Sequence, residues 1–369
     1  MHSRYESYRR LQMTPTLPGI PVIDVREGGP LRHAQLRPAQ ARALRDSCLQ
    51  FFPRAALPLI PALDRLAHRS LRRSCSPYLA EIAAIAETLD FSGVWMLNAS
   101  YQWGCTARAC QQHGEPWLIR TLDWPFKGLG RHTEIARMRG AGGDFFSVTW
   151  PGYVGVLTAM APRRFAASLN QAPMWRRTCH RWLRPFDHAI NTLRASGVSC
   201  IAPDQLLRRA FDECKDFPSA RHLLEGTPVA RPAIYTLVGC APDEGCVIER
   251  TETEFLTRFG RTCAANDWEP CRLGWEGRIG MRRFLVSSFA EAAGFSRARR
   301  ESLAAWNGSL SASEFDWLRE PVLNPYTRLA VSMNPARGIL RAVGYDLTGD
   351  VLPAPVTEIC ELELLAEAA

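Results

Sequence analysis

Residues 98–126, NASYQWGCTARACQQHGEPWLIRTLDWPF, decide both the fold and the chemistry expected of this chain. Upstream of them, the periodicity of apolar residues is mostly helical; beyond Cys105, the pattern changes to short apolar strands separated by Gly and Pro turns. Cys105 therefore stands at the boundary between a helical and a strand-rich segment. Its thiol is a strong nucleophile once ionised, but at neutral pH it needs a nearby base or a positive field.

Two ways of activating Cys105 are open. A papain-like arrangement would supply an imidazole, for which His113 and His132 are candidates by residue type. Alternatively, the Gly104–Cys105 bond breaks, and the freed α-amine, which titrates at about 7.7 to 8, becomes a base on the same residue. Attack by the thiol on the unhindered Gly104 carbonyl would give a thioester for water to resolve. The cut would leave 104 residues and 369 − 104 = 265 residues.

Outward from this segment, the periodicity predicts two groups of strands, each followed by helices. The first group follows Cys105 and is expected to form a sheet of consecutive neighbours. Two sheets packed face to face with helices outside make a four-layer αββα sandwich of the α+β class. Residues 1–104 would wrap this sandwich as a mostly helical small subunit, and 105–369 would form the catalytic region. The expected strands are 20–25, 116–122, 145–150, 153–160, 164–169, 233–239, 246–250, 261–265, 327–333 and 338–342; the expected helices are 37–52, 76–89, and others within 180–225 and 278–319.

Composition excludes several classes of protein. With 46% hydrophobic and 22% charged residues, the chain is neither disordered nor fibrous. The net charge of +8 comes from 45 basic and 37 acidic residues, but only Lys127 and Lys215 are lysines. So large an excess of arginine indicates a GC-rich, bacterial genome rather than a phosphate-binding surface, and no nucleic-acid partner is expected. No apolar run could span a bilayer, and no export signal is visible, which predicts a cytoplasmic location.

The twelve cysteines are scattered, so reduced thiols are expected. Cys105 and Cys110 with His113 imitate metal-ligand spacing, but no second pair completes four ligands. We therefore expect neither a metal nor a cofactor.

The motifs around Cys105 resemble a known family. Cys105-Thr106 followed by RTLD at 120–123 is similar to the start of the N-terminal-nucleophile (Ntn) cysteine hydrolases of the acid ceramidase, N-acylethanolamine acid amidase and choloylglycine hydrolase group. This resemblance covers most of the chain and implies the Ntn-hydrolase fold. Its further segments, in order, are YLAEIAAI at 78–85, GYVGVLTAMAPRRFAASLN at 152–170, YTLVGCAPDEGCVIERT at 235–251, CAANDWEP at 263–270 and PVLNPYTRLAVSM at 321–333.

The resemblance implies roles for particular residues. Cys105 would be the nucleophile, with its α-amine moving the proton. Arg120 would lower the thiol pKa and bind near the carbonyl, and Asp123 would hold the α-ammonium. Asn170, as in the bile-salt hydrolase branch, would aid the oxyanion or the amine. Asn266 would donate its amide to the oxyanion, an interaction worth about 3 kcal/mol in a dry site.

One more arginine, Arg278, lies where the family carries an arginine after the Asn266 segment. Each of these residues also has a structural interpretation. Arg120 and Asp123 could form an ion pair, Asn170 and Asn266 could be turn residues at strand ends, and Arg278 could belong to a solvated helix face.

The implied reaction is hydrolysis of a linear, ceramide-like or other fatty-acyl N-acyl amide through a thioester on Cys105. Two alternatives stay open: an acyltransferase of the same fold that passes the acyl group to an amine, and an unprocessed binding protein. An apolar acyl chain is favoured by aromatic residues expected near the site: Trp124, Phe126, Trp150, Tyr153 and Trp175.

The basic and aromatic stretch 163–184 has three interpretations. It could stack on nucleic acid, it could form a rim in which Trp175 and Trp182 meet a membrane surface, or it could be an ordinary amphipathic helix. The second makes contact with a membrane surface an expectation to be tested.

Overall fold

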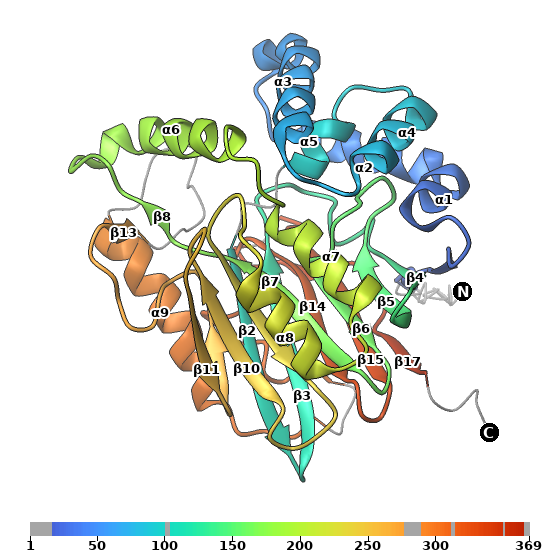
Figure 1. The fold of residues 1–369 in the computed structure, drawn as a ribbon, viewed down its shortest axis with the longest axis vertical. Helices are drawn as coiled ribbons and strands as arrows, with labels where there is room; N and C mark the ends of the chain where they lie inside the picture. Colours follow the sequence, from blue (N-terminus) through green and yellow to red (C-terminus); the bar gives the residue numbers. More distant parts are fainter. Residues whose placement is uncertain (1–16, 100–103, 277–288, 311–313, 350, 365–369) are drawn as a thin grey trace, which may run out of the picture.

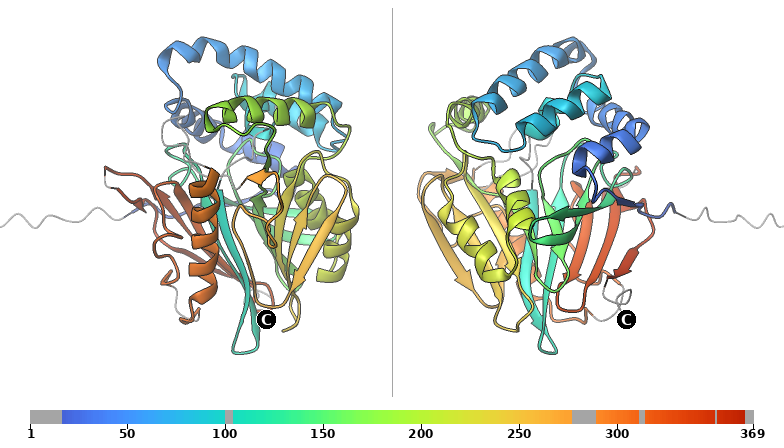
Figure 2. Two further views of the ribbon diagram at one scale, coloured as in Figure 1. Left: turned by 90° about the vertical axis from the view of Figure 1, so that its left-hand side faces the viewer. Right: turned by 45° about the vertical axis from the view of Figure 1, so that its right-hand side comes forward.

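Two β-sheets lie face to face in the computed structural model, which describes residues 17–99, 104–276, 289–310, 314–349 and 351–364. Apolar side chains from both sheets form one core between them. Helices α7 and α8 pack on the first sheet, and α9 packs on β2 and β12 of the second. The expected four-layer α+β sandwich is thus confirmed (Figures 1 and 2).

The two sheets draw strands from both halves of the chain. The first contains, in spatial order, β1 (Val22–Asp24), β4 (Glu134–Gly140), β5 (Gly143–Thr149), β6 (Thr158–Ala161), β7 (Phe165–Gln171), β9 (Ala233–Val238), β10 (Gly245–Arg250) and β11 (Phe255–Phe259). The second contains β12 (Thr262–Ala264), β2 (Gly104–Gln112), β3 (Glu115–Asp123), β14 (Thr327–Asn334), β15 (Ile339–Asp346) and β16 (Ala354–Pro355), with β17 (Cys360–Glu363) also on β15. A separate pair joins β8 (Met174–Trp175) to β13 (Trp275–Glu276).

The helices have the following bounds. The N-terminal segment carries α1 (Gly29–Leu36), α2 (Pro38–Leu49), the 3-10 helix η1 (Arg54–Leu59), α3 (Ile60–Arg73), α4 (Leu79–Leu89) and α5 (Val94–Ala99). The rest of the described chain carries η2 (Arg181–Leu183), α6 (Arg184–Ser196), α7 (Pro203–Glu213), α8 (Phe217–Gly226) and α9 (Phe289–Ala305). No helix in these described ranges combines the length and the apolar character that a bilayer span requires.

One expectation about the sheets was wrong. The strands within 116–169 do not form a single sheet, because β3 pairs with β2 and β14 in the second sheet, whereas β4 to β7 belong to the first. Both faces of β3 are buried: Leu118 and Leu122 face the core between the sheets, and Trp117 and Ile119 face a second apolar cluster. Such a strand has no apolar–polar alternation, so its sequence does not show which sheet it joins.

The expected strand at 153–160 was also too long. Only Thr158–Ala161 is a strand there, and the residues before it form turns. Gly152 has φ +91°, which a side chain at this position would strain. The turns delay entry into the strand until Thr158.

The N-terminal segment is built into the sandwich rather than only wrapped around it. Its strand β1 pairs in parallel with β4 at the edge of the first sheet. His33 Nε2 of α1 lies 2.6 Å from Oε2 of the buried Glu134 of β4, and Nη2 of Arg37, the residue after α1, lies 2.7 Å from Oε1 of the same carboxylate. A strand pair and a buried ionic cluster therefore hold residues 17–99 to the rest of the chain.

Candidate active site

Cys105 is the second residue of β2, and its side chain points into the core between the sheets. Only 4% of the residue is exposed. The neighbouring strand places Arg120 beside it, because Arg120 pairs with Ala107 in the β2–β3 register. Arg120 Nη2 donates to the Cys105 sulfur at 3.1 Å and to the Leu169 carbonyl at 3.2 Å, and Nη1 donates to Thr158. One buried guanidinium thus bridges the two sheets at the thiol.

Burial raises the pKa of the Cys105 thiol above its ordinary value. The charges of Arg120 and Arg299 oppose this by lowering the pKa, whereas the Asp123 carboxylate raises it further. Burial prevails in the uncut chain, so the sulfur is protonated at neutral pH. Ionising it requires either a base or a change in solvation.

The backbone nitrogen of Cys105 has a partner of its own. It donates to Oδ1 of Asn266, just after β12, at 2.9 Å. The amide nitrogen of Asn266 donates to the Gln171 carbonyl at 2.8 Å, and its backbone N–H donates to Ser296 Oγ at 2.9 Å. Of the two ends of the Asn266 side-chain amide, only the NH₂ group can donate to the Gln171 carbonyl, so the side-chain oxygen must face Cys105.

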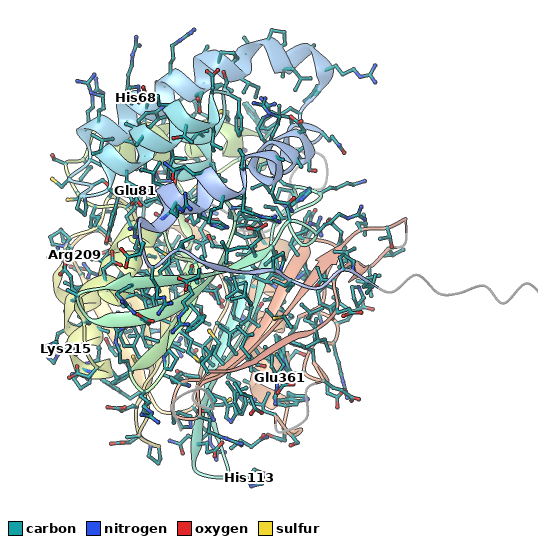
Figure 3. All side chains as sticks on the ribbon, turned by 90° about the vertical axis from the view of Figure 1, so that its right-hand side faces the viewer. His68, Glu81, His113, Arg209, Lys215 and Glu361 are labelled. Atoms are coloured by element: carbon teal, nitrogen blue, oxygen red, sulfur yellow. The ribbon has the colours of Figure 1, made fainter. Side chains whose placement is uncertain are left out.

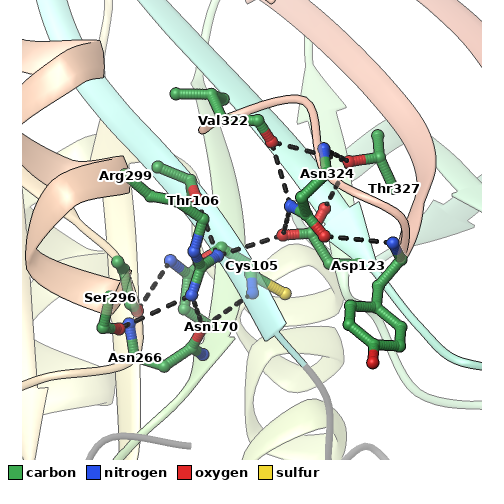
Figure 4. A network of polar contacts seen from close by, with 12 residues as sticks. Cys105, Thr106, Asp123, Asn170, Asn266, Ser296, Arg299, Val322, Asn324 and Thr327 are labelled. Carbon is green, nitrogen blue, oxygen red and sulfur yellow. Dashed lines mark hydrogen bonds and ion pairs between the residues drawn. The ribbon is translucent and has the colours of Figure 1, made fainter. Parts of the chain in front are cut away.

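A residue that the sequence did not indicate, Arg299 of α9, joins these groups. Its Nη1 donates to the Cys105 carbonyl and to Thr106 Oγ1, both at 2.9 Å, and lies 3.0 Å from Asp123 Oδ2. Its Nη2 donates to Asn266 Oδ1 at 2.7 Å (Figure 4). Arg299 is only 1% exposed, so a full positive charge is buried beside the nucleophile.

Asp123, at the end of β3, is the anion of this network. Its Oδ2 accepts from Asn324 at 3.0 Å as well as from Arg299, and its Oδ1 accepts from Thr327 Oγ1 at 3.1 Å. Gly104 lies opposite Asp123 in the β2–β3 register. A Cβ on Gly104 would lie only 3.3 Å from the Asp123 Cβ, so the strands approach closely at the expected cleavage site.

Asn170, at the end of β7, completes the buried set. Its amide nitrogen makes two long bonds, to the carbonyls of Ala264 at 3.3 Å and Ala265 at 3.2 Å. Its oxygen is buried and has no hydrogen-bond partner among the described residues. A buried acceptor of this kind usually has a ligand or a water as partner. Arg278 lies outside the described residues.

Neither histidine considered as a base lies at the thiol. His113 is in the turn at the far end of the β2–β3 hairpin (Figure 3), eight residues and about 26 Å along the strand from Cys105. His132 contacts Gln40 and Ser47. Cys105 and Cys110, whose spacing imitates that of metal ligands, face different apolar clusters on opposite faces of β2. Within the described ranges, no group of three His, Cys, Asp or Glu residues could hold a metal ion.

Four of the five aromatic residues expected near the site form one cluster, which includes Trp124, the residue that follows β3. Trp124 stacks on Trp150 at 5.8 Å, with Phe126 and Tyr153 in edge contacts. Trp175 lies elsewhere, in β8, against Trp275. Trp124 and Phe126 also line a largely apolar cavity of about 90 Å³ whose other walls come mostly from α2, α4 and α5. The N-terminal helices therefore help to form an apolar site next to Asp123.

Comparison with known proteins finds a class of amidases. No family model matches the chain. Among curated proteins, the chain is 28% identical over 183 residues to the N-acylethanolamine-hydrolyzing acid amidase of Rattus norvegicus, covering 47% of each chain. It is also 28% identical over 225 residues to a probable acid ceramidase of Caenorhabditis elegans, covering 52% of each. The matches thus span about half the length of these relatives, and the sequence resemblance is confirmed.

Solved structures give weaker matches. The Caenorhabditis elegans ortholog of N-acylethanolamine-hydrolyzing acid amidase aligns with a TM-score of 0.44 and 17% identity over 63% of this chain and 93% of that one. Penicillin V acylase from Agrobacterium tumefaciens aligns with a TM-score of 0.37 and 12% identity, covering 70% and 91%.

Proposed function

We propose that this chain is a self-processing amidohydrolase that cleaves linear N-acyl amides through a thioester on Cys105. The observation that best supports the proposal is that the sulfur and the nitrogen of one residue are each held by a different buried side chain, Arg120 and Asn266. The similarity to amidases named for N-acylethanolamine hydrolysis supports an N-acyl amide as substrate.

In the processing step, Cys105 Sγ attacks the carbonyl carbon of Gly104. A carbon–sulfur bond forms, the carbon–nitrogen bond breaks, and the thiol proton goes to the departing α-amine. Water then hydrolyses the thioester, which gives a Gly104 carboxylate and a free thiol. The new amine would already face the Asn266 oxygen, because that oxygen accepts the backbone N–H before cleavage.

In the amide reaction, the α-amine of Cys105 takes the thiol proton and the sulfur attacks the acyl carbonyl of the substrate. The carbon–nitrogen bond of the substrate then breaks, and the substrate's amine leaves with that proton. Water hydrolyses the resulting thioester and releases the carboxylic acid. Arg120 favours the thiolate by its charge. The buried Asn170 oxygen is suited to accept an N–H from the amine half of the substrate.

The oxyanion donor is better supplied by Asn170 than by Asn266 in the uncut chain. The Asn266 amide nitrogen is engaged at 2.8 Å by Gln171, whereas the Asn170 bonds of 3.2 and 3.3 Å are weak enough to exchange for a negatively charged oxygen. Donation from Asn266 would require its side chain to turn away from Gln171.

The apolar cavity beside Trp124 and Phe126 supports an apolar acyl group. Its volume of about 90 Å³ is below the ~300–1,000 Å³ of pockets that hold drug-sized ligands. A long acyl chain therefore enters only if the N-terminal helices move apart from the loop after β3. Cleavage before Cys105 would release the covalent link that restrains them.

We also propose contact with a membrane surface, through the outer faces of α3 and α6, which pack against one another. Exposed apolar side chains gather on both helices, and arginines accompany them, as in interfacial helices. Cytoplasmic location stays a prediction. The exposed residues are Leu63 and Leu66 of α3, Trp182 just before α6, and Phe186 and Leu193 of α6.

The test compares wild type with Cys105→Ala and the matched control Cys110→Ala, a second buried cysteine of β2. Intact-mass spectrometry should find pieces of 104 and 265 residues for wild type and Cys110→Ala, and one uncut chain for Cys105→Ala. Wild type and Cys110→Ala should release fatty acid from fatty-acyl amides, and Cys105→Ala should not. In the two active proteins, hydroxylamine should trap the thioester as a hydroxamate. Full-length wild-type protein that releases no acid would contradict the proposal.

A further inference from the structure

A second cavity, of about 270 Å³, is lined partly by α6 and shares no lining residue with the apolar cavity beside Trp124. Its walls come from α6, from β8 and the residues after it, from the segment before β9, and from β13. The lining carries three arginines, Arg177, Arg194 and Arg231, against one carboxylate, Glu252. Its charge balance therefore favours an anion.

One of these arginines is held in a fixed orientation. Arg177 Nε and Nη2 both donate to Asn191 Oδ1, at 3.1 and 2.8 Å, and Asn191 Nδ2 donates to the Trp175 carbonyl at 2.8 Å. These bonds tie α6 to β8 across the cavity. A guanidinium that is already ordered loses less conformational entropy when it binds an oxyanion.

The cavity opens beside an apolar surface. Trp175 and Trp275 form an edge-to-face pair at 5.3 Å and line the cavity together. On α6, Leu193 is 63% exposed and directly precedes the cavity arginine Arg194, while Phe186 is 56% exposed. The cavity thus has arginines and tryptophans in its lining, and exposed apolar side chains lie on the helix that forms one of its walls. Anionic lipids present the same order, a charged head next to apolar chains.

We propose that this cavity binds the phosphate of an anionic phospholipid, whose acyl chains lie against the exposed apolar residues of α6. Arginine is suited to this role because its planar fork of N–H groups matches phosphate oxygens. The inference rests on the proposed membrane contact and extends it from a general surface attraction to a specific head-group site.

The test uses full-length Cys105→Ala protein and vesicles of phosphatidylcholine with or without phosphatidylglycerol. Arg177→Gln and Arg194→Gln remove cavity charges, and Arg176→Gln removes the same charge from a neighbouring residue outside the cavity lining. If the protein is held only by a general surface attraction, all three variants should lose about fivefold in affinity for phosphatidylglycerol vesicles. A cavity site predicts that the two cavity variants lose at least about tenfold more affinity for phosphatidylglycerol vesicles than the control. It also predicts that glycerol phosphate, added at constant ionic strength, releases the protein with unchanged cavity arginines from phosphatidylglycerol vesicles.

The outcomes separate the sources of phosphate. If calorimetry shows inorganic phosphate binding that needs Arg177 and Arg194 while vesicle binding does not, the ligand is a soluble phosphate and the lipid proposal is overturned. Equal losses in all three variants also overturn it. Vesicle binding that needs the cavity arginines, in a protein whose wild type hydrolyses no amide, would support the cavity site and contradict only the proposed enzyme activity. Retention of self-processing in the otherwise wild-type Arg177→Gln chain checks that this variant folds.

Discussion

Replacing Arg299 by glutamine should destabilise the chain far more than the same change at its neighbour Arg300. Arg299 and its partner Asp123 are 1% and 3% exposed, and the ion pair is 3.0 Å long. Removing one member of a buried pair leaves the other charge uncompensated, which costs about 3–5 kcal/mol. Arg300 is 15% exposed and pairs with Asp267 and the half-exposed Glu269, so its loss should cost about 1 kcal/mol or less.

The assay is urea unfolding in a Cys105→Ala background, which keeps every variant as a single uncut chain. Adding Asp123→Asn to Arg299→Gln should recover part of the loss, because the second change removes the stranded carboxylate. Two results would refute the reasoning: Arg299→Gln no less stable than Arg300→Gln, or a double variant whose loss equals the sum of the single ones.

Three other predictions follow from the site and its surroundings. Burial raises the pKa of the Asp204 carboxyl to about 6 from 3.8. Between about pH 4 and 6 the carboxyl is therefore protonated in the folded chain and ionised in the unfolded chain, so the free energy of unfolding falls as pH rises, by about 3 kcal/mol in all. Asp204→Asn should flatten this part of the pH dependence measured by urea unfolding. Gly104→Ala should slow self-processing, followed by intact mass, because its Cβ would crowd Asp123, while Gly226→Ala, with nothing within 4 Å, should process at the normal rate. Leu49→Trp should fill the apolar cavity and lower kcat/KM for a long-chain amide, leaving a short-chain amide almost unchanged; equal losses for both would contradict the assignment of this cavity to the acyl chain.

Sequence periodicity located best the strands whose ends carry strong turn residues, and it missed β2 and β4. The strands at 233–239 and 246–250, for example, match β9 and β10 closely, separated by a Pro-Asp-Glu-Gly turn. The pairing of strands was harder to foresee. β3 is buried on both faces, so its sequence is compatible with either sheet, and only long-range packing assigns it to the second.

The polar site shows a similar division. Cys105, Arg120 and Asp123 lie on two neighbouring strands, so a local motif contains them all. Arg299 is almost 200 residues away, within the run RARR at 297–300 of a chain with 43 arginines, and nothing in that run distinguishes it. Its importance follows only from the packing of α9 against β2. The assignment of a site role to Arg278 came from alignment alone and stays a prediction.

The uncut chain already has the arrangement that the proposed chemistry needs. Asn266 accepts the Cys105 backbone N–H, Arg299 donates to the Cys105 carbonyl, and Arg120 donates to the sulfur, all before any bond is cut. Groups fixed in advance need no reorganisation during reaction, which is why preorganised donors stabilise transition states better than water does. The same burial raises the pKa of the thiol and keeps it protonated. Of the two histidines considered as bases, neither His113 nor His132 reaches the sulfur; under the proposed mechanism, cleavage supplies a base as the amine of Cys105 itself.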